Sequence, residues 1–426
     1  MLKKVIQDKV IGVIGLGYVG LPLALAFGKV KQTIGFDINQ KRIQQLNHKI
    51  DTTGEVEKKD FDLANLISFT TCKDDLKKAN IYIITVPTPV DNNNEPDLSL
   101  IDEATAMVAS LISHGDIIIY ESTVYPGVTE DFCKPIIERI SGLKFNIDFF
   151  LGYSPERINP GDNSKKIQDI TKVVSGSTKD SLETIYNLYD EIINAGIFRA
   201  KSIKVAEAAK VIENTQRDVN IGLINELSRI FNKMDIDTTE VLNAAKTKWN
   251  FLPFEPGLVG GHCIGVDPYY IAFKAKELQI DPDVILSARK INDSMPKHIV
   301  NILNTMITRT FNESDINILL LGLTFKEDCP DFRNSKSVVL AKEMFNLNFQ
   351  VQLSDEKIDS EQFKLETGFE ISNEFSEKKY HAIILAVPHK YLKEKDIGFY
   401  KSLLKENGLF FDLKSIFPKE DSAFRL

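Results

Sequence analysis

One cysteine of this chain lies in a glycine-rich segment, residues 254–268. Cys263 follows two glycines, the first of them Gly260, and stands directly after His262. Glycine lets the backbone approach a ligand closely, and a thiolate is a strong nucleophile. We therefore predict that Cys263 bonds covalently to a carbonyl group, with His262 and Asp267 tuning its reactivity. The alternative is an ordinary buried cysteine that packs as a small apolar side chain.

Polar side chains in two upstream segments suit the same chemistry. Lys210, Asn214 and Arg217 are spaced i, i+4 and i+7, so a helix presents all three on one side. A lysine ammonium beside an asparagine amide forms a donor pair suited to a developing oxyanion. In a proline-bounded loop further upstream, Glu156 is a candidate general base and Arg157 a candidate ligand for a phosphate or sugar. A solvated polar stripe and a surface ion pair are the respective alternatives.

The segment that begins at Gly15 has the G-x-G-x-x-G spacing of dinucleotide-binding proteins. Gly15 permits a tight turn, Gly17 lets a pyrophosphate approach the backbone, and Gly20 packs a helix against a strand. Asp37 follows about 20 residues later, where a carboxylate binds the ribose 2′-hydroxyl and repels a 2′-phosphate. The pattern therefore predicts NAD⁺ rather than NADP⁺, with Arg42 covering the adenine or offsetting that repulsion. The alternative is a glycine turn in another α/β fold.

Together these groups predict a reaction that no single motif indicates. A hydride acceptor, a thiol, an oxyanion donor pair and a base would oxidise a primary alcohol to an acid in two stages. The thiol would trap the intermediate aldehyde as a thiohemiacetal, which is oxidised to a thioester and then hydrolysed. Thr88 and Thr123, each after a predicted strand, would hydrogen-bond the cofactor or water. Taken alone, each of these threonines indicates only a strand-end turn.

These residues need a framework of alternating strands and helices. Short apolar runs alternate with helical patterns in the first half and in the last third of the chain, which is typical of parallel, doubly wound sheets. The segment from Ser202 to Met234 predicts one long helix, or two shorter helices broken near Gly222. We predict an α/β protein with two Rossmann-like doubly wound domains joined by a long central helix. The predicted strands are Val10–Ile14, Thr33–Asp37, Ile81–Val86, Asp116–Tyr120, Asn317–Gly322, Phe349–Leu353, Ala382–Val387 and Leu409–Asp412.

The overall composition disfavours several classes of partner. The formal net charge of −8 argues against nucleic-acid binding, because Lys and Arg provide no excess positive charge. The four cysteines form no C-x-x-C pair and no metal-ligand spacing, so we expect neither a disulfide framework nor a metal site. We find no apolar leader and no run of about 18 apolar residues that could span a membrane. These features predict a cytoplasmic protein.

Several motifs stand in order along nearly the whole chain. They are Gly15–Pro22, Val86–Pro89, Glu121–Val124, Ser154–Arg157, Lys210 with Asn214, Gly260–Asp267, and Leu323–Asp328 with Arg333. Together they resemble the UDP-glucose/GDP-mannose dehydrogenase family, which implies an NAD-dependent enzyme that acts on a nucleotide-linked sugar and dimerises through its central helix. The resemblance also implies three domains. These are an NAD-binding domain over 1–200, a central helical domain with the catalytic loop and dimer interface over 201–300, and a UDP-sugar-binding domain over 301–426.

The resemblance also implies a role for each site residue. Cys263 would be the thioester nucleophile, Thr123 would position water near the nicotinamide, and Lys326 would contact the nucleotide-sugar. The implied catalytic residues are Cys263, Lys210, Asn214, Glu156, Asp267 and Thr123. The implied cofactor-binding residues are Gly15, Gly17, Tyr18, Val19, Gly20, Asp37, Arg42, Thr88, Thr123 and Arg333. The implied substrate-binding residues are Arg157, Ile158, Lys210, Asn214, Arg217, Gly260 and Lys326.

Local features are similar to one branch of this family. Arg157 after Glu156, and His262 before Cys263, resemble enzymes that act on UDP-N-acetylhexosamines rather than on UDP-glucose. The run Trp249–Phe254, together with Ser154–Gly161, resembles bacterial enzymes that oxidise the C6 hydroxyl of UDP-N-acetylglucosamine or UDP-N-acetylgalactosamine to the uronic acid, for capsules and O-antigens. UDP-N-acetylmannosamine and UDP-glucose are the alternative substrates. A two-electron dehydrogenase and an inactive nucleotide-sugar-binding protein are the alternative functions. Glu255 departs from the neutral or basic residue expected at its position, which weakens any phosphate contact from that loop.

Overall fold

The chain folds into two compact units. The computed structural model describes residues 9–91, 93–157, 166–261 and 263–426, so the predicted site residues Ile158 and His262 lie outside the described residues. The N-terminal unit comprises Met1–Glu213 and Tyr269–Ile280, and the C-terminal unit comprises Asn214–Pro268 and Asp281–Leu426. Within the described part of the chain, no helix is long and apolar enough to cross a membrane.

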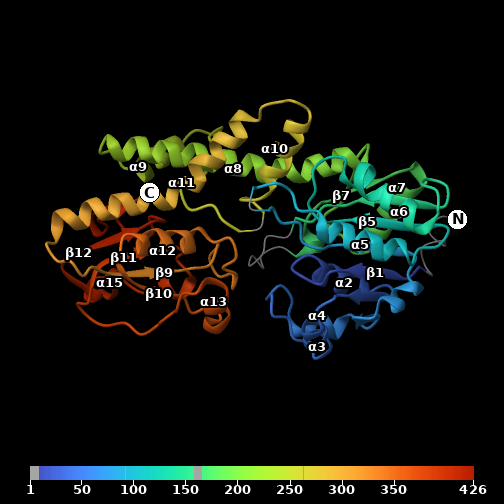
Figure 1. The fold of residues 1–426 in the computed structure, drawn as a ribbon, viewed down its shortest axis with the longest axis horizontal. Helices are drawn as coiled ribbons and strands as arrows, with labels where there is room; N and C mark the ends of the chain where they lie inside the picture. The colour runs from blue at the N-terminus through green and yellow to red at the C-terminus, as the bar shows by residue number, and fades with distance from the viewer. Residues whose placement is uncertain (1–8, 92, 158–165, 262) are drawn as a thin grey trace. The chain divides into compact units, whose positions relative to one another are not determined.

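Among the described residues, an eight-stranded sheet organises the N-terminal unit (Figure 1). Its strands are β1 Ile11–Ile14, β2 Thr33–Phe36, β3 Ile67–Thr70, β4 Ile81–Ile84, β5 Asp116–Tyr120, β6 Phe149–Tyr153, β7 Lys172–Gly176 and β8 Ile197–Arg199. The order is β3-β2-β1-β4-β5-β6-β7-β8, and β7 runs antiparallel to β6 whereas the other pairs are parallel. The order reverses between β1 and β4, and the loops after these two strands therefore open at the switch point where such sheets bind ligands.

Helices cover both faces of this sheet. They are α2 Gly20–Gly28, α3 Gln40–Asn47, α4 Lys58–Leu63, α5 Ser99–Ala109, α6 Lys134–Ser141 and α7 Lys179–Asp190, with short turns η1 Lys73–Lys78, η2 Val128–Cys133 and η3 Ile167–Asp169. On β4, Ile81 and Ile83 pack in the apolar cluster of α2 and α7, whereas Tyr82 and Ile84 pack in that of α5 and α6. Successive strand residues point to opposite faces, so the predicted doubly wound sheet is confirmed.

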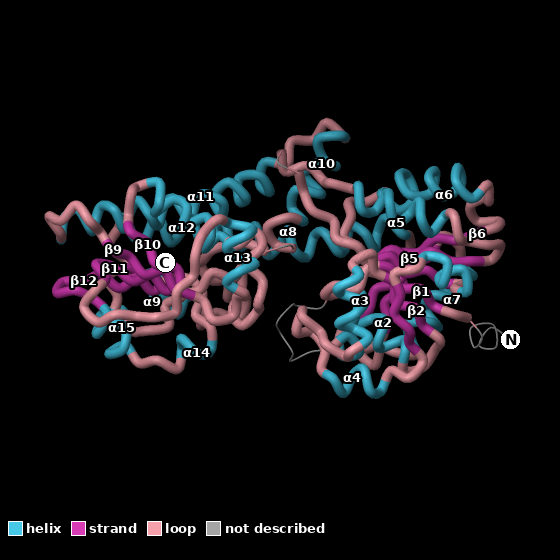
Figure 2. The backbone as a smooth tube through the Cα atoms, turned by 60° about the horizontal axis from the view of Figure 1, so that its bottom comes forward, coloured by secondary structure: helices cyan, strands magenta, loops and turns pink. Residues whose placement is uncertain are grey.

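The C-terminal unit repeats this architecture with a parallel sheet (Figure 2). Its strands are β9 Asn317–Leu321, β10 Gln350–Ser354, β11 Tyr380–Leu385, β12 Leu404–Asp412 and β13 Phe424–Arg425. Its helices are α9 Thr238–Ala245, α11 Asp283–Thr310, α12 Lys336–Asn346, α13 Ser360–Thr367, α14 Lys390–Lys393 and α15 Ile397–Leu403, with the turn η4 Lys419–Asp421. The order β10-β9-β11-β12-β13 reverses between β9 and β11, so the loops after these strands open at a second switch point.

A long central helix, α8, runs without a break from Ile203 to Lys233, and a further helix, α10, covers Asp267–Glu277. The prediction of one helix over Ser202–Met234 is confirmed, and the alternative of a break near Gly222 is wrong. A Cβ added at Gly222 would lie 2.9 Å from the Cβ of Ala288 on α11. This glycine therefore allows two helices to pack closely rather than interrupting one of them.

The turn between β1 and α2 uses its three glycines in different ways. Gly15 has a φ of +91°, in the left-handed region that favours glycine. A Cβ at Gly20 would lie 1.8 Å from the carbonyl oxygen of Gly15, so only glycine lets the helix start this close to the strand. At Gly17, nothing lies within 4 Å of the position of a Cβ. The turn thus leaves open the side at which a pyrophosphate is expected to approach.

A buried ionic cluster joins α8 to α11 in the C-terminal unit. Arg289 is 2% exposed, and its Nη1 lies 2.5 Å from Oδ1 of Asp218, whose side chain is fully buried. Asn292 donates a further hydrogen bond of 2.7 Å to the same carboxylate oxygen. Breaking a buried ion pair leaves an uncompensated charge in a low-dielectric interior, so this cluster fixes how the two helices pack.

We expect Gly17→Ala and Gly20→Ala to separate cofactor binding from folding. Gly20→Ala introduces a steric clash and should lower the free energy of unfolding by about 1–3 kcal/mol. Gly17→Ala meets no protein atom, so stability should stay within about 0.5 kcal/mol while NAD⁺ affinity falls about tenfold. Thermal unfolding and titration calorimetry measure the two effects. Unchanged NAD⁺ affinity in Gly17→Ala would show that this turn does not hold the dinucleotide.

We expect Arg289→Met to lower the free energy of unfolding by about 3–5 kcal/mol, because it leaves Asp218 charged and buried. Urea denaturation measures this difference. Arg309→Met is the matched control, because Arg309 lies on the same helix and is exposed. A loss in Arg289→Met no larger than that of the control would contradict the role given to the ion pair.

Candidate active site

Hydrogen bonds brace the turn that is expected to hold the cofactor. Asp37 follows β2 and accepts a hydrogen bond of 2.9 Å from the N–H of Leu16. Arg42 is buried; its Nε donates to the Leu16 carbonyl over 3.0 Å, and its guanidinium pairs with Asp51 at 2.9 Å. Although burial opposes its charge, hydrogen bonds from Thr53 and the pairing with Arg42 keep the pKa of Asp51 below its usual value. Arg42 therefore supports the turn from within the protein, and its contact with adenine stays a prediction.

The loops after β4 and β5 are tied together at the same edge of the sheet. Ser122 Oγ donates to the Val86 carbonyl over 2.7 Å. Thr88 and Thr123 lie on these two loops, and both are partly exposed. The structure therefore places Thr88 on a loop of the switch point and Thr123 on the neighbouring loop, both at the carboxyl edge of the sheet.

A buried cluster of charged side chains holds the predicted base, Glu156. Nζ of Lys172 lies 2.7 Å from Glu156 and 2.9 Å from Glu121, and the exposed fractions of the three side chains are 3%, 4% and 0% respectively. The hydroxyl of Tyr189 donates to Glu121. Burial raises the pKa of Glu121 to about 7 even though Lys172 opposes this shift. Although burial disfavours its charge, the two carboxylates raise the pKa of Lys172, so Glu156 is paired with a protonated amine.

Arg157 contacts α8 in the N-terminal unit. Its Nη2 donates to the carbonyl of Ala209 over 3.0 Å and pairs with Glu213 at 2.7 Å. Lys210, on the same stretch of helix, is buried. Arg157 therefore fastens the helical turn that carries Lys210, and its contact with a phosphate or sugar stays a prediction.

In the C-terminal unit, two other predicted site residues hold Asn214. Its Nδ2 donates to Asp267 over 2.5 Å, and its Oδ1 accepts from Arg217 over 3.1 Å. Asn214 and Asp267 are both buried. The predicted helical spacing is present because α8 is continuous through these residues. The structure thus joins Asp267, which opens α10, to the face of α8 predicted from spacing alone.

A pair of hydrogen bonds anchors the glycine-rich loop before Cys263. The amide of Asn225 on α8 donates to the Gly257 carbonyl over 3.0 Å and accepts from the Gly257 N–H over 2.8 Å. Further along, the carbonyl of Cys263 accepts the N–H of Asp267 over 2.9 Å at the start of α10. Cys263 is partly exposed. Cys263 therefore lies at a partly exposed position four residues before the start of α10.

The Cys263 loop packs onto two other loops of the same unit. The N–H of Gly261 donates to the carbonyl of Asn334 over 3.2 Å. A Cβ at Gly260 would lie 2.4 Å from that carbonyl oxygen, and one at Gly261 would lie 2.6 Å from the ring of Phe325. The glycines therefore bring the Cys263 loop against the segments that carry Lys326 and Arg333.

A buried histidine, His389, hydrogen-bonds to the loop that carries Lys326. His389 Nδ1 accepts the N–H of Asp328 over 2.9 Å, and its Nε2 lies 3.0 Å from Asp355, which directly follows β10. A backbone N–H can only donate, so Nδ1 is the acceptor and Nε2 carries the proton that faces Asp355. This arrangement fixes the loop at the second switch point and leaves Lys326 partly exposed.

Arg333 projects from the segment before α12. Its guanidinium pairs with Asp331 at 2.6 Å, and 51% of its side chain is exposed. The carbonyl of Asp331 accepts the N–H of Phe325 over 3.0 Å, which ties this segment to the Lys326 loop. An exposed guanidinium in this position can reach an anionic ligand.

Sequence reasoning missed four buried polar residues that support the site: Lys172, Asn225, Asp355 and His389. Lys172 opens β7, a strand that the apolar pattern did not predict, and Asn225 is hidden in the long helical pattern of α8. One available signal was Asp355, which follows β10 as Asp37 follows β2. The other three are recognisable only by their partners.

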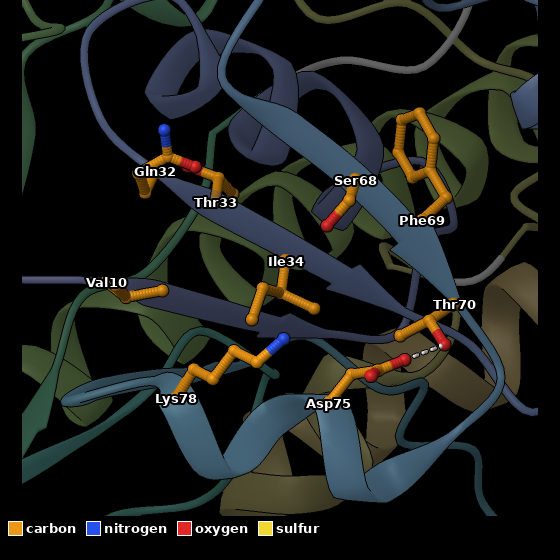
Figure 3. A pocket seen from close by; sticks show the side chains of 9 residues that line it. All are labelled: Val10, Gln32, Thr33, Ile34, Ser68, Phe69, Thr70, Asp75 and Lys78. Atoms are coloured by element: carbon orange, nitrogen blue, oxygen red, sulfur yellow. Dashed lines mark hydrogen bonds between the residues drawn. The ribbon is translucent and has the colours of Figure 1, made fainter.

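A cavity of about 390 Å³ lies between β2, β3 and η1 of the N-terminal unit (Figure 3). Its lining includes Thr70, whose hydroxyl donates to Asp75 over 2.7 Å, and Lys78. No residue of the predicted site lines this cavity. This cavity is therefore separate from the candidate site residues.

Comparison with known families identifies three successive parts of the chain. The NAD binding domain of the UDP-glucose/GDP-mannose dehydrogenase family matches residues 9–193. The central domain of that family matches residues 204–294, and its UDP binding domain matches residues 319–419. The first of these matches confirms NAD as the cofactor, in agreement with the open glycine turn.

Similar proteins cover the chain from end to end. The UDP-N-acetyl-D-glucosamine 6-dehydrogenase of Pseudomonas aeruginosa is 50% identical over 421 residues, which are 99% of this chain and 100% of that protein. Protein CapL of Staphylococcus aureus is 48% identical over 417 residues, which are 97% of this chain and 98% of that protein. The solved structure of UDP-D-ManNAc dehydrogenase from Pyrococcus horikoshii has a TM-score of 0.87 at 28% identity, with 98% of each chain covered. The predicted NAD-dependent dehydrogenase is thereby confirmed, and the chain belongs to the UDP-glucose/GDP-mannose dehydrogenase family.

Proposed function

We propose that this enzyme oxidises the C6 hydroxyl of a UDP-N-acetylhexosamine, UDP-GlcNAc or UDP-GalNAc, to the uronic acid for surface polysaccharide biosynthesis. The observation that carries the proposal is the packing of the Cys263 loop on the loop of Lys326. This packing supports a site in which Cys263 acts as the nucleophile and Lys326 provides a cation suited to a nucleotide-sugar. Relatives named UDP-N-acetyl-D-glucosamine 6-dehydrogenase, at 50% and 47% identity, support the N-acetylglucosamine form.

The proposed reaction removes four electrons in two stages. NAD⁺, held by the glycine turn and Asp37, accepts one hydride from C6 at each stage, so the alcohol, water and two NAD⁺ give the acid, two NADH and two protons. Between the stages, the Cys263 thiolate adds to the aldehyde carbon and forms a thiohemiacetal. Lys210 and Asn214 donate hydrogen bonds to the oxygen that becomes negative in this step.

Loss of the second hydride turns the thiohemiacetal into a thioester, which water must then hydrolyse. Water attacks the thioester carbon, the C–S bond breaks, and the thiolate of Cys263 leaves. Glu156 accepts a proton from this water and Thr123 positions it, while Asp267 supports the cysteine and water. Arg157, Arg217 and Lys326 contribute positive charge for the diphosphate and sugar.

We assign the steps to three parts of the chain. Residues 1–200 bind NAD⁺, residues 201–300 carry the catalytic loop and a dimer interface, and residues 301–426 bind the UDP-sugar. The glycine turn of the first part and the second switch point, at β9 and β11, support this division.

We also infer a homodimer that forms through α8. Val205, Ile212, Leu223 and Ile230 recur at intervals of seven or eleven residues, which a helix places on one face. The exposed fractions of their side chains are 49%, 55%, 52% and 47%. A row of large apolar side chains on a soluble helix indicates a surface that a partner covers. The self-complementary face of a second copy is the proposed partner.

A cytoplasmic location is part of this proposal. All four cysteines lie in the described residues, and no disulfide joins any of them. This is typical of a protein that works in a reducing compartment.

We expect the enzyme to release two NADH per molecule of UDP-GlcNAc or UDP-GalNAc when the sugar is limiting. Each hydride transfer reduces one NAD⁺, so absorbance at the end of the reaction counts the stages. Parallel reactions with UDP-ManNAc and UDP-glucose test the alternative substrates. One NADH per sugar would contradict the thioester mechanism, and preference for UDP-glucose would contradict the N-acetylhexosamine assignment.

Cys263→Ser is the matched variant for this experiment, because it keeps an oxygen nucleophile of similar size. We expect turnover to fall at least about a hundredfold while NAD⁺ affinity stays within about twofold, because only the trapping step loses its thiolate. Cys72→Ser, at an exposed cysteine, should leave both quantities unchanged. Normal turnover by Cys263→Ser would remove the cysteine from the reaction.

We expect Leu223→Glu with Ile230→Glu to convert the dimer to a monomer, because the change places charges in an apolar interface. Analytical ultracentrifugation measures the mass of the assembly. Leu365→Glu is the control, because Leu365 is an exposed leucine on α13, 87% accessible. A monomer for the unaltered protein, or a dimer that survives the double change, would contradict the α8 interface.

A further inference from the structure

The reversed direction of β7 places a lysine beside two acidic strand ends. Glu121 directly follows β5 and Glu156 lies shortly after β6, so both stand near the carboxyl edge of the parallel strands. Because β7 is antiparallel to β6, its first residue, Lys172, lies at this same edge. A parallel strand at this position would have placed its first residue at the opposite edge. The topology therefore brings together three charged groups from separate segments.

One ammonium group serves two carboxylates in this cluster. Lys172 Nζ is 2.7 Å from Oε2 of Glu156 and 2.9 Å from Oε2 of Glu121. The other oxygen of Glu156 accepts the N–H of Arg157 over 2.5 Å, and the other oxygen of Glu121 accepts the hydroxyl of Tyr189. Each carboxylate therefore accepts a hydrogen bond at both of its oxygens. Two acids are buried here with one base, so keeping both acids ionised costs free energy.

We propose that Lys172 is a positioning residue that fixes the Glu156 carboxylate for proton transfer, and that Glu121 adjusts this hold by competing for the same ammonium group. The proposal rests on the proposed function, in which Glu156 accepts a proton from the attacking water. Lys172 and Glu121 themselves act through Glu156 and need not touch the substrate.

The two states of Glu121 leave Glu156 in different surroundings. When Glu121 is protonated, its neutral carboxyl group attracts the Lys172 ammonium only weakly, and the full ammonium charge acts on Glu156. When Glu121 ionises, the ammonium is shared, so less positive charge opposes proton uptake by Glu156. Because burial raises the pKa of Glu121 to about 7, this exchange occurs near neutral pH. Turnover should therefore rise as pH increases through that range.

Glu121→Gln tests the competition, because glutamine mimics the protonated acid at every pH. We expect kcat to match the unaltered enzyme at about pH 6 and to fall at least about threefold below it at about pH 8. The ionisation near neutrality should disappear from the kcat profile, while KM for the sugar stays within about twofold. An unchanged kcat profile in a folded Glu121→Gln enzyme would overturn the competition.

The double variant Lys172→Met with Glu121→Gln tests the positioning role. The second change is included because loss of the ammonium group alone would leave both Glu121 and Glu156 without their cation. We expect kcat to fall about tenfold or more at every pH, and Lys172→Arg to recover most of the loss because it keeps the charge. Lys31→Met is the matched control, since Lys31 is another buried lysine of this unit, 5% exposed and paired with Glu191. It should leave the kcat profile unchanged. A double variant that keeps normal kcat would overturn the positioning role.

A measurement without turnover separates this inference from the proposed function. In protein labelled with carboxyl-¹³C glutamate, the Glu156 resonance should shift at the pH at which Glu121 titrates, and Lys172→Met should abolish that shift. A Glu156 resonance that does not shift when Glu121 titrates would overturn the inference even in an active enzyme. Absence of NADH from every UDP-sugar would instead contradict the proposed function, while the resonance would still report on the cluster.

Discussion

Parallel strands deliver the residues that follow them to one edge of their sheet, and the candidate chemistry of both units depends on this constraint. Gly15, Thr123 and Glu156 come from three loops of one sheet, and Lys326 and Asp355 come from two loops of the other. The strands themselves are buried on both faces, so within each sheet polar groups gather where strands end. The switch points then decide which of these loops have room for a ligand.

Reversal of one strand adds a charged group that a purely parallel sheet would not provide. Lys172 reaches the carboxyl edge because β7 is antiparallel to β6, and it meets Glu121 and Glu156 there. Burying these groups is costly unless each is paired and hydrogen-bonded, and each carboxylate has two donors here. A site assembled in this way needs little reorganisation when charge develops on a substrate.

Glycines set the distances between elements in the C-terminal unit. Gly222 lets α8 and α11 approach, and Gly260 and Gly261 let the Cys263 loop pack closely against its neighbours. At each position a Cβ would lie within 3 Å of another atom, so a larger residue requires the backbone to move. The candidate nucleophile Cys263 therefore sits on a loop held by packing and by the paired hydrogen bonds of Asn225.

Several features were determined by the sequence alone. The turn at Gly15, the acid at Asp37 and the helical pattern over Ser202–Met234 follow from local spacing, because each depends on neighbours within one or two elements. The order of motifs also indicated the family, and the strand and helix alternation indicated both doubly wound sheets.

The tertiary structure alone decided where the polar side chains point. Arg42 and Arg157, whose ligand contacts stay predictions, both donate to groups of the protein itself. Lys172 and His389 carried no local signal, because their partners come from other strands and loops. Spacing along a chain can specify a turn or a helical face, whereas the partner of a buried charge depends on strand order and direction. Those are set by packing between segments far apart in the sequence.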